Sequence, residues 1–144
     1  MKKIIILIIL TITLTGCIKN ENFSETCKVE KFSENITDKT STKVTYNNKD
    51  EILNATVTKT YKSKNDKGKE TIKSIKESSD TYNQKYADNP NIKIEISADT
   101  EDEYQIKYHL KVQKLDDNIL REFELTKNSI RYFNLMKNEK IECK

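Results

Sequence analysis

The chain has 144 residues, 34% of them charged, with 26 basic side chains against 23 acidic ones and with only two glycines and one proline. This length suits a single domain with a core of its own. The lysines are interleaved with acids along the whole chain, which argues against a nucleic-acid binder, because that affinity depends on clustered lysines and arginines.

The first sixteen residues have the pattern of an export signal. Lys2 and Lys3 precede an apolar run, Ile4 to Leu14, which is shorter than the roughly 20 residues of a membrane span. The run ends at Leu14-Thr15-Gly16-Cys17, which resembles a bacterial lipobox. We therefore predict cleavage before Cys17 and a diacylglycerol thioether on its sulfur. An ordinary cleaved signal followed by a chance cysteine is the less favoured alternative.

The predicted lipid determines where the protein works. One acyl chain binds a membrane only marginally, whereas two or three, at about 0.8 kcal/mol per buried CH₂, give lasting attachment. We expect a domain anchored on the extracytoplasmic face of the bacterial cell membrane, and the rest of the sequence has no apolar run long enough to span it. The predicted organisation is a signal peptide over 1–16, a lipidated tether over 17–25 and one domain over 26–144.

Two further cysteines, Cys27 and Cys143, stand near the two ends of the predicted domain. Export places them where disulfides persist, and two cysteines allow only one intramolecular pairing. We predict a bridge between them. Two buried thiols or a metal pair are the alternatives, and the metal pair is the poorer one because zinc prefers four ligands and the chain has one histidine.

The first half of the domain is predicted to form strands. Cys27, Val29 and Phe32 are expected on one face of a first strand. Alternating apolar positions then run over 41–46 and 53–61, separated by the turn residues 47–50, which predicts a hairpin. Its expected core face consists of Thr42, Val44, Tyr46, Leu53, Ala55, Val57 and Tyr61.

Past a polar loop over 62–69, the apolar spacing changes to that of a helix. Ile72, Ile75, Ser79, Tyr82 and Tyr86 fall on one stripe, which ends before Pro90. A second hairpin is predicted over 92–98 and 104–112. Two short helical segments follow, with Ile119, Leu120 and Phe123 expected to be buried in the first and Ile130, Phe133 and Met136 in the second, and a last extended piece contains Ile141 and Cys143.

This order of elements predicts an α+β fold. Two hairpins give a four- to five-stranded antiparallel sheet, and its apolar face needs a cover. The amphipathic helix over 72–86 and the C-terminal helical segment are the expected cover, both on one face of the sheet.

This layout resembles the YehR-like family of small bacterial lipoproteins. The resemblance rests on the lipobox at 14–17, on the threonine-rich hairpin from Thr42 to Tyr61, and on the helix and hairpin pattern from Ile72 to Val112. It implies the same fold and membrane address. The family has no established activity, so the resemblance implies no catalytic or ligand-binding residue.

No residue pattern in the sequence indicates a catalytic, cofactor or metal site. His109 is expected on the solvent face of its strand, and Gly68 is the only glycine of the mature domain, which excludes a glycine-rich phosphate loop. Asp99, Glu101, Asp102 and Glu103 lack the spacing of a calcium loop and are expected to form a solvated turn. Six tyrosines are assigned to core packing in preference to a sugar or peptide groove: Tyr46, Tyr61, Tyr82, Tyr86, Tyr104 and Tyr108.

These observations predict a non-enzymatic binding or accessory domain of the cell envelope. Its membrane contact is the lipid on Cys17, and its partner is an envelope protein or the cell wall, contacted through the polar sheet face, a strand edge or the tail. One alternative is an envelope hydrolase that uses acidic residues which sequence alone does not pair. A purely structural envelope or stress protein is a third hypothesis. The oligomeric state is left open.

Overall fold

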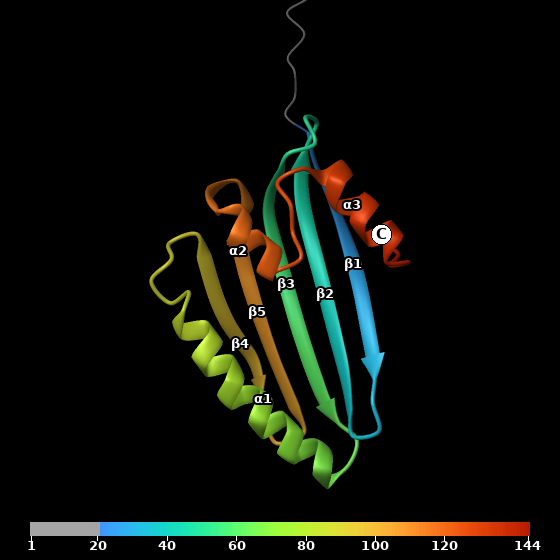
Figure 1. Ribbon diagram of the computed structural model, residues 1–144, viewed down its shortest axis with the longest axis vertical. Coiled ribbons are helices and arrows are strands. Elements are labelled where there is room, and N and C mark those ends of the chain that lie inside the picture. The colour runs from blue at the N-terminus through green and yellow to red at the C-terminus, as the bar shows by residue number, and fades with distance from the viewer. Residues whose placement is uncertain (1–20) are drawn as a thin grey trace, which may run out of the picture.

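The computed structural model describes residues 21–144, which form a five-stranded antiparallel sheet with helices packed on one face (Figure 1). The predicted α+β fold is confirmed. The strands lie in the spatial order β1-β2-β3-β5-β4, so the chain makes a three-stranded meander, crosses the sheet through one helix and returns as a hairpin. The elements are β1 (Asn22–Phe32), β2 (Ile36–Asn47), β3 (Ile52–Ser63), α1 (Asp66–Gln84), β4 (Ile92–Asp99), β5 (Glu103–Lys111), a 3-10 turn (Val112–Lys114), α2 (Asp117–Glu122) and α3 (Ser129–Asn138).

β1 begins inside the range expected for the tether. Asn22 already pairs with Asn47 of β2, so residues 22–25 belong to the sheet. Cys27 is buried, as predicted, but Phe32 is 71% exposed, so its assignment to the core was wrong. Phe32 is an odd number of residues from Cys27, and side chains alternate along a strand, which places it on the opposite face.

The predicted hairpin of β2 and β3 forms around a turn stabilised by Asn47. Its side-chain oxygen accepts hydrogen bonds from the backbone N–H groups of Lys49 at 2.9 Å and Glu51 at 3.0 Å. Asp50 takes a φ of 60°, a left-handed conformation that aspartate tolerates better than most residues. The turn chemistry expected from residues 47–50 is therefore present in the structure.

A β-bulge changes which residues of β3 are buried. The register shifts between Thr45 and Tyr46, so that Tyr46 pairs with Ile52. Ile52 is consequently fully buried, whereas Leu53, which was expected in the core, is only half-buried. A bulge inserts one unpaired residue and reverses the alternation beyond it.

α1 begins earlier than its apolar stripe indicates. The loop expected over 62–69 ends at Asn65, whose side chain caps the helix by accepting the N–H of Gly68 at 2.9 Å. Gly68 is buried against the turn between β1 and β2, and a Cβ at this position would lie 2.3 Å from the carbonyl oxygen of Asn35. Only glycine fits this approach of the helix to the sheet.

The predicted stripe of α1 packs on the sheet, with Ile72 fully buried and Ile75 and Tyr82 against the core. The helix ends at Gln84, so Tyr86 is buried from the turn that follows it. In the β4 and β5 hairpin, Ile96 is 48% exposed although it was expected in the core. β4 is one of the two edge strands and carries a second bulge at this point, which leaves Ile96 without a neighbour on its outer side.

The C-terminal helices were predicted correctly in place but not fully in orientation. Leu120 and Phe123 are buried, as expected. In α3, however, Ile130 is 55% exposed, and the buried side chains are those of Ser129, Tyr132 and Met136. The aromatic ring of Tyr132 therefore takes the core position that was expected for Ile130.

Candidate functional site: a groove between α1 and α2

The helices cover the sheet unevenly (Figure 1). α1 lies along the β4 and β5 side, while α2 and α3 lie over the opposite end of the sheet. Between them the helix side of the sheet is hollowed in two adjoining places: a cavity of about 200 Å³ above β1, β2 and β3, and an open recess of about 700 Å³ beside α1. Both are lined by Lys59, Tyr61 and Glu122, so they form one continuous depression, which we call the groove.

Apolar side chains form part of the lining of the groove, and they predominate in the recess. The cavity is lined by buried side chains from strands and helices, among them Val57, Phe123, Tyr132 and Met136, together with Cys27 of the disulfide. Burial raises the pKa of Tyr132 to about 12, so its phenol is neutral. Charged and hydroxyl side chains of the walls contribute more of the cavity's exposed surface than these buried groups do, so a side chain that entered the cavity would contact polar as well as apolar atoms.

Tyr61 of β3 stands where the cavity meets the recess. Its ring stacks on Tyr104, with ring centroids 6.4 Å apart. Burial, and secondarily the nearby Asp38 carboxylate, raise the pKa of Tyr61 to about 12. No hydrogen bond to its hydroxyl forms within residues 21–144, although every buried side-chain polar atom there has a partner. The hydroxyl is therefore open to solvent and free to donate or accept a hydrogen bond.

Charged groups of both signs form the walls. Lys31, Asp38, Lys59 and Glu124 line the cavity, and Glu122 lies between the cavity and the recess. The Glu122 carboxylate is held by Lys85, with Nζ 2.6 Å from Oε1, and it also accepts the hydroxyl of Tyr86. These hydrogen bonds, that of Lys85 first, keep the pKa of Glu122 below its usual value. Glu122 thus connects α2 to the end of α1 as a carboxylate.

The tyrosines beneath α1 have a different role, because the helix satisfies their hydroxyls. Tyr104 donates to Ser79 at 3.1 Å and Tyr108 donates to Asn83 at 2.9 Å. Burial raises the pKa of Tyr108 to about 12 and also raises that of Tyr82. The prediction that tyrosines pack the core is therefore right beneath α1 and incomplete at Tyr61, where the ring is packed but the hydroxyl is free.

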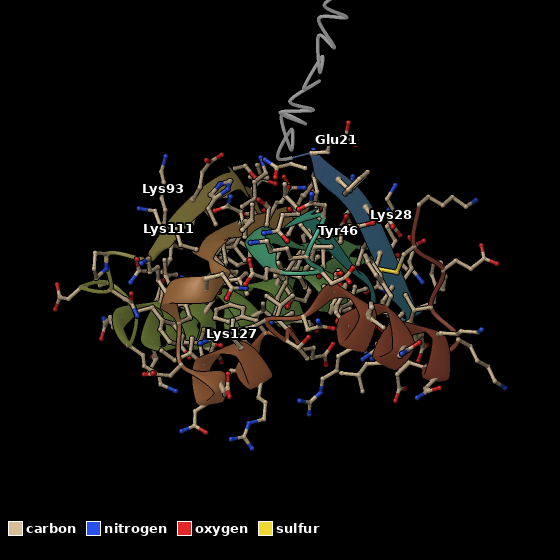
Figure 2. The ribbon with its side chains drawn as sticks, turned by 90° about the horizontal axis from the view of Figure 1, so that it is seen from above. Glu21, Lys28, Tyr46, Lys93, Lys111 and Lys127 are labelled. Atoms are coloured by element: carbon tan, nitrogen blue, oxygen red, sulfur yellow. A yellow bond between two sulfur atoms is a disulfide. The ribbon has the colours of Figure 1, made fainter. Side chains whose placement is uncertain are left out.

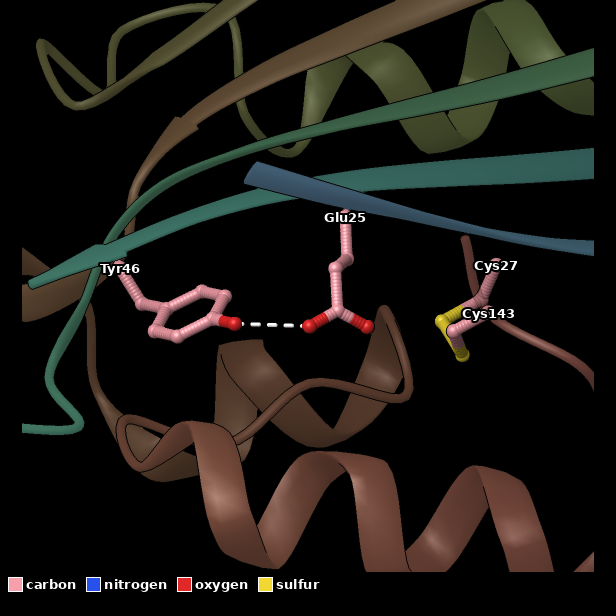
Figure 3. Close-up of a disulfide and its surroundings, with 4 residues drawn as sticks. All are labelled: Glu25, Cys27, Tyr46 and Cys143. Atoms are coloured by element: carbon pink, nitrogen blue, oxygen red, sulfur yellow. Dashed lines mark hydrogen bonds between the residues drawn. A yellow bond between two sulfur atoms is a disulfide. The ribbon is translucent and has the colours of Figure 1, made fainter. Parts of the chain in front are cut away.

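The β1 edge of the sheet is joined to the C-terminal tail. Along β1, Cys27 and Cys143 lie at disulfide distance, with their sulfurs 1.99 Å apart, as predicted (Figure 3). The backbones of Thr26 and Lys144 exchange hydrogen bonds of 2.7 and 3.0 Å beside this bridge. The tail therefore occupies part of the β1 edge. Toward α3, the Tyr46 hydroxyl donates to Glu25 at 2.7 Å, a bond that does most to raise the pKa of Tyr46 to about 12 (Figure 3).

His109 and the acidic turn lie outside the groove. His109 is on the helix-free face, with Nδ1 3.3 Å from the Thr56 hydroxyl and Nε2 3.5 Å from Glu95. The turn carboxylates point to separate partners: Asp99 lies 2.5 Å from Lys76, and Asp102 accepts a hydrogen bond from Ser63 at 2.9 Å. Within residues 21–144 no group of three or more histidine, cysteine or acidic side chains is placed to hold a metal ion.

The predicted signal peptide and Cys17 lie outside the described residues. No helix within 21–144 is both long and apolar enough to cross a membrane.

Sequence reasoning missed the groove, although one signal of it was available. Lys59 lies between Val57 and Tyr61 on the core face of β3, and Asp38 and Thr40 continue the face of Thr42 and Val44. Charged residues at core-face positions indicate that the cover of the sheet ends there. The contributions of Glu122 and Glu124 depend on where α2 packs and had no signal in the sequence.

Comparisons with known proteins bear on the fold. No protein-family model and no curated protein matches the chain. Among solved structures, the NMR structure of a protein from Streptococcus pneumoniae TIGR4 matches with a TM-score of 0.54 and 15% sequence identity, over 100% of this chain and 97% of that one. This likeness shows that the fold occurs elsewhere over nearly the same length.

Proposed function

We propose that this chain is a lipid-anchored, extracytoplasmic binding domain of the bacterial cell envelope, without catalytic activity, and that the groove holds an extended polypeptide segment of an envelope partner. The anchor is supported by the lipobox-like Leu14 to Cys17 and the apolar run before it. The binding role rests on one observation: at Tyr61 a free hydroxyl stands where a polar-walled cavity meets a mainly apolar recess. The relation to YehR-like lipoproteins remains a prediction.

The shape of the groove favours a polypeptide over a small molecule, because its more enclosed part is small and its larger part is open to solvent. Pockets that enclose a small ligand usually measure roughly 300–1,000 Å³, and the cavity, at about 200 Å³, is smaller. It suits a single side chain. The rest of the ligand would lie along the open recess of about 700 Å³ toward α1.

The polar groups of the groove suit a peptide backbone. Tyr61 offers a neutral hydroxyl that both donates and accepts, and Thr40 lines the same cavity. Two lysines and three carboxylates line the cavity walls, so neither sign of charge dominates. A strongly anionic or cationic ligand would gain little there, whereas a segment with alternating polar groups finds complementary partners.

The strand edges are less suited to a partner. The tail and the disulfide occupy the middle of the β1 edge. β4 carries a bulge between Ile96 and Ala98, a feature that discourages another strand from pairing. These features favour the groove over the edges as the contact site.

A hydrolase is the second candidate, because Asp38, Glu122 and Glu124 all line the cavity. Glycoside hydrolysis uses a pair of carboxyl groups, one of them protonated as the acid. Glu122 is unsuited to that role, because its bonds to Lys85 and Tyr86 lower its pKa. Hydrolysis would therefore need Asp38 or Glu124 as the acid, with another carboxylate of the cavity as the base or nucleophile.

The anchor is tested by mass spectrometry of the protein extracted from membranes. We expect an N-terminal peptide that begins at Cys17 and carries acyl chains. Cys17→Ser should remain unprocessed or leave the membrane, whereas the matched Cys27→Ser variant should stay lipidated. An intact N-terminus without an acyl group would contradict the anchor.

The groove is tested with a display library of random twelve-residue peptides, panned against the lipidated chain in zwitterionic nanodiscs. We expect enriched peptides with a recurrent apolar residue, and Tyr61→Ala should weaken their binding at least tenfold. The matched control, His109→Ala on the other face, should bind as the parent does. Enrichment of peptides that bind Tyr61→Ala equally well would contradict the assignment, and cleavage of bound peptides would favour the hydrolase.

A further inference from the structure

The helix-free face of the sheet, which we call the open face, is strongly basic. Alternation along the strands places on it the neighbours of the buried Cys27, Val57 and Tyr108. The open face carries three glutamates, Glu30, Glu95 and Glu103, and seven lysines, Lys28, Lys39, Lys43, Lys62, Lys93, Lys107 and Lys111. Figure 2 shows Lys28, Lys93 and Lys111 projecting from the sheet away from α2 and α3.

Few of these charges are neutralised locally. Lys62 lies 3.2 Å from Glu103, and Lys107 lies 3.5 Å from Glu95. Glu30 stands opposite Lys39 in the register of β1 and β2. Within the described residues, five open-face lysines have no carboxylate within ion-pair distance, namely Lys28, Lys39, Lys43, Lys93 and Lys111.

The excess of positive charge is specific to this face. The 26 basic residues of the sequence include Lys2, Lys3 and Lys19, so residues 21–144 contain equal numbers of basic and acidic side chains, 23 of each. The rest of the domain surface is therefore net negative. Such a separation of charge orients a protein at a charged surface, because one face is attracted while the others are repelled.

The described chain begins on the basic side. Glu21 lies on the same side of the sheet as Lys28, Lys93 and Lys111 (Figure 2). Cys17 is five residues before Asn22, and an extended chain covers at most about 3.6 Å per residue. If Cys17 carries lipid, the start of β1 is held within about 18 Å of the headgroups. A sheet tethered so closely can lie with its open face on the membrane.

We propose that the open face lies against an anionic lipid surface, that of the membrane holding the anchor, so that the groove on the other side faces away from the bilayer. This inference rests on the proposed lipid anchor. The side chains between the lysines are mainly serines and threonines, so lysine ammonium groups extend farthest and reach phosphates first. Each lysine near such a surface strengthens the contact by roughly fivefold.

The test is amine-reactive footprinting of the lipidated full chain on vesicles, read by mass spectrometry. Phosphatidylcholine vesicles are compared with vesicles that also contain phosphatidylglycerol, at low and high salt. We expect labelling of Lys28, Lys43 and Lys93 to slow at least threefold on the anionic vesicles, and high salt to reverse the effect. Lys73 of α1 and Lys137 of α3 are the internal controls and should label equally on both.

A matched pair of variants strengthens the test. Lys28→Gln, Lys43→Gln and Lys93→Gln together should abolish protection of Lys39 and Lys111, whereas Lys73→Gln with Lys137→Gln should leave it unchanged. Circular dichroism establishes that both variants are folded. Equal labelling on the two vesicle types would overturn the inference. So would equal protection by soluble polyphosphate beside phosphatidylcholine vesicles, which would indicate a general polyanion face.

Failure of the anchor gives a different result. A chain without lipid would not float with phosphatidylcholine vesicles. Flotation with the anionic vesicles then decides the inference, because the open-face variant must lose binding that the parent shows. Absence of any flotation by the parent would overturn both proposals.

Discussion

The two regions of the helix side, one beneath α1 and one around the cavity next to Tyr61, use tyrosine in opposite ways. Beneath α1, Tyr104 and Tyr108 pack against the core and donate their hydroxyls to Ser79 and Asn83 of the helix. At the groove, Tyr61 stacks on the same cluster but its hydroxyl has no partner within the described chain. A tyrosine whose ring and hydroxyl are both satisfied serves the fold, whereas one with a packed ring and a free hydroxyl is prepared to contact something else.

The two sides also differ in how they are held together. Ile72 anchors α1 over β3 and β5 by burial, and Gly68 allows the helix to touch the sheet. On the groove side, β1 is the edge strand and is joined to the C-terminus by the disulfide. The groove side therefore depends more on one covalent link.

Removal of the disulfide should destabilise the protein more than any other change considered below. The double variant Cys27→Ser, Cys143→Ser opens a loop that spans 116 residues, and in the chain-entropy model the unfolding free energy should fall by about 4 to 5 kcal/mol. Urea unfolding followed by circular dichroism measures this. The parent treated with reductant is the control and should lose a similar amount. A loss below about 1 kcal/mol would show that packing alone holds the β1 side.

Gly68→Ala tests the contact beneath α1. Alanine in place of glycine normally stabilises a helix by about 1 kcal/mol. Here the new Cβ would lie 2.3 Å from the Asn35 carbonyl oxygen, so we expect a loss of about 1–3 kcal/mol from overpacking. Ser74→Ala, on the same helix, is the control and should change stability by less than about 0.5 kcal/mol. A stabilised Gly68→Ala protein would mean that α1 does not touch this turn.

A matched pair of tyrosine variants tests the comparison itself. Tyr108→Phe removes the donor to Asn83 and leaves that part-buried amide oxygen without its partner, which should cost about 1 kcal/mol in urea unfolding. Tyr61→Phe removes a hydroxyl with no partner in the described chain and should change stability by less than about 0.5 kcal/mol. Equal losses in the two variants would remove the distinction between the two tyrosines.

The smallest effect concerns the carboxylate that joins α1 to α2. The bonds from Lys85 and Tyr86 hold the pKa of Glu122 below its ordinary value of 4.5 in the folded protein. The stabilisation is therefore complete above that value and is lost as the pH falls through the folded pKa. Glu122→Gln should reduce stability at neutral pH and converge with the parent in acid. Glu139→Gln changes an exposed residue and is the control. The difference between its unfolding free energy and that of the parent should not depend on pH.

Much of the fold follows from alternation and helical spacing, because those patterns report burial directly. They placed both hairpins, α1 and the two short C-terminal helices. The errors at Leu53 and Ile96 come from bulges, which depend on strand pairing rather than on local pattern. The exposure of Ile130 depends on how α3 packs, and burial of Tyr132 in its place was equally compatible with the spacing.

The groove was harder to predict because it is a place that the helices leave uncovered. Lys59 and Asp38 interrupt apolar faces and carry a weak signal in the sequence. Tyr61 and Glu122 are far apart in the chain, and only the packing of α2 on the sheet places both in the lining of the groove.

Photo-crosslinking in intact cells tests whether the partner contacts the groove. Benzoylphenylalanine replaces Tyr61 in one strain and Leu135, an exposed residue of α3, in another. We expect one discrete adduct from position 61, made with a polypeptide of the cell envelope and absent from position 135. No adduct from position 61, or the same adducts from both positions, would contradict it.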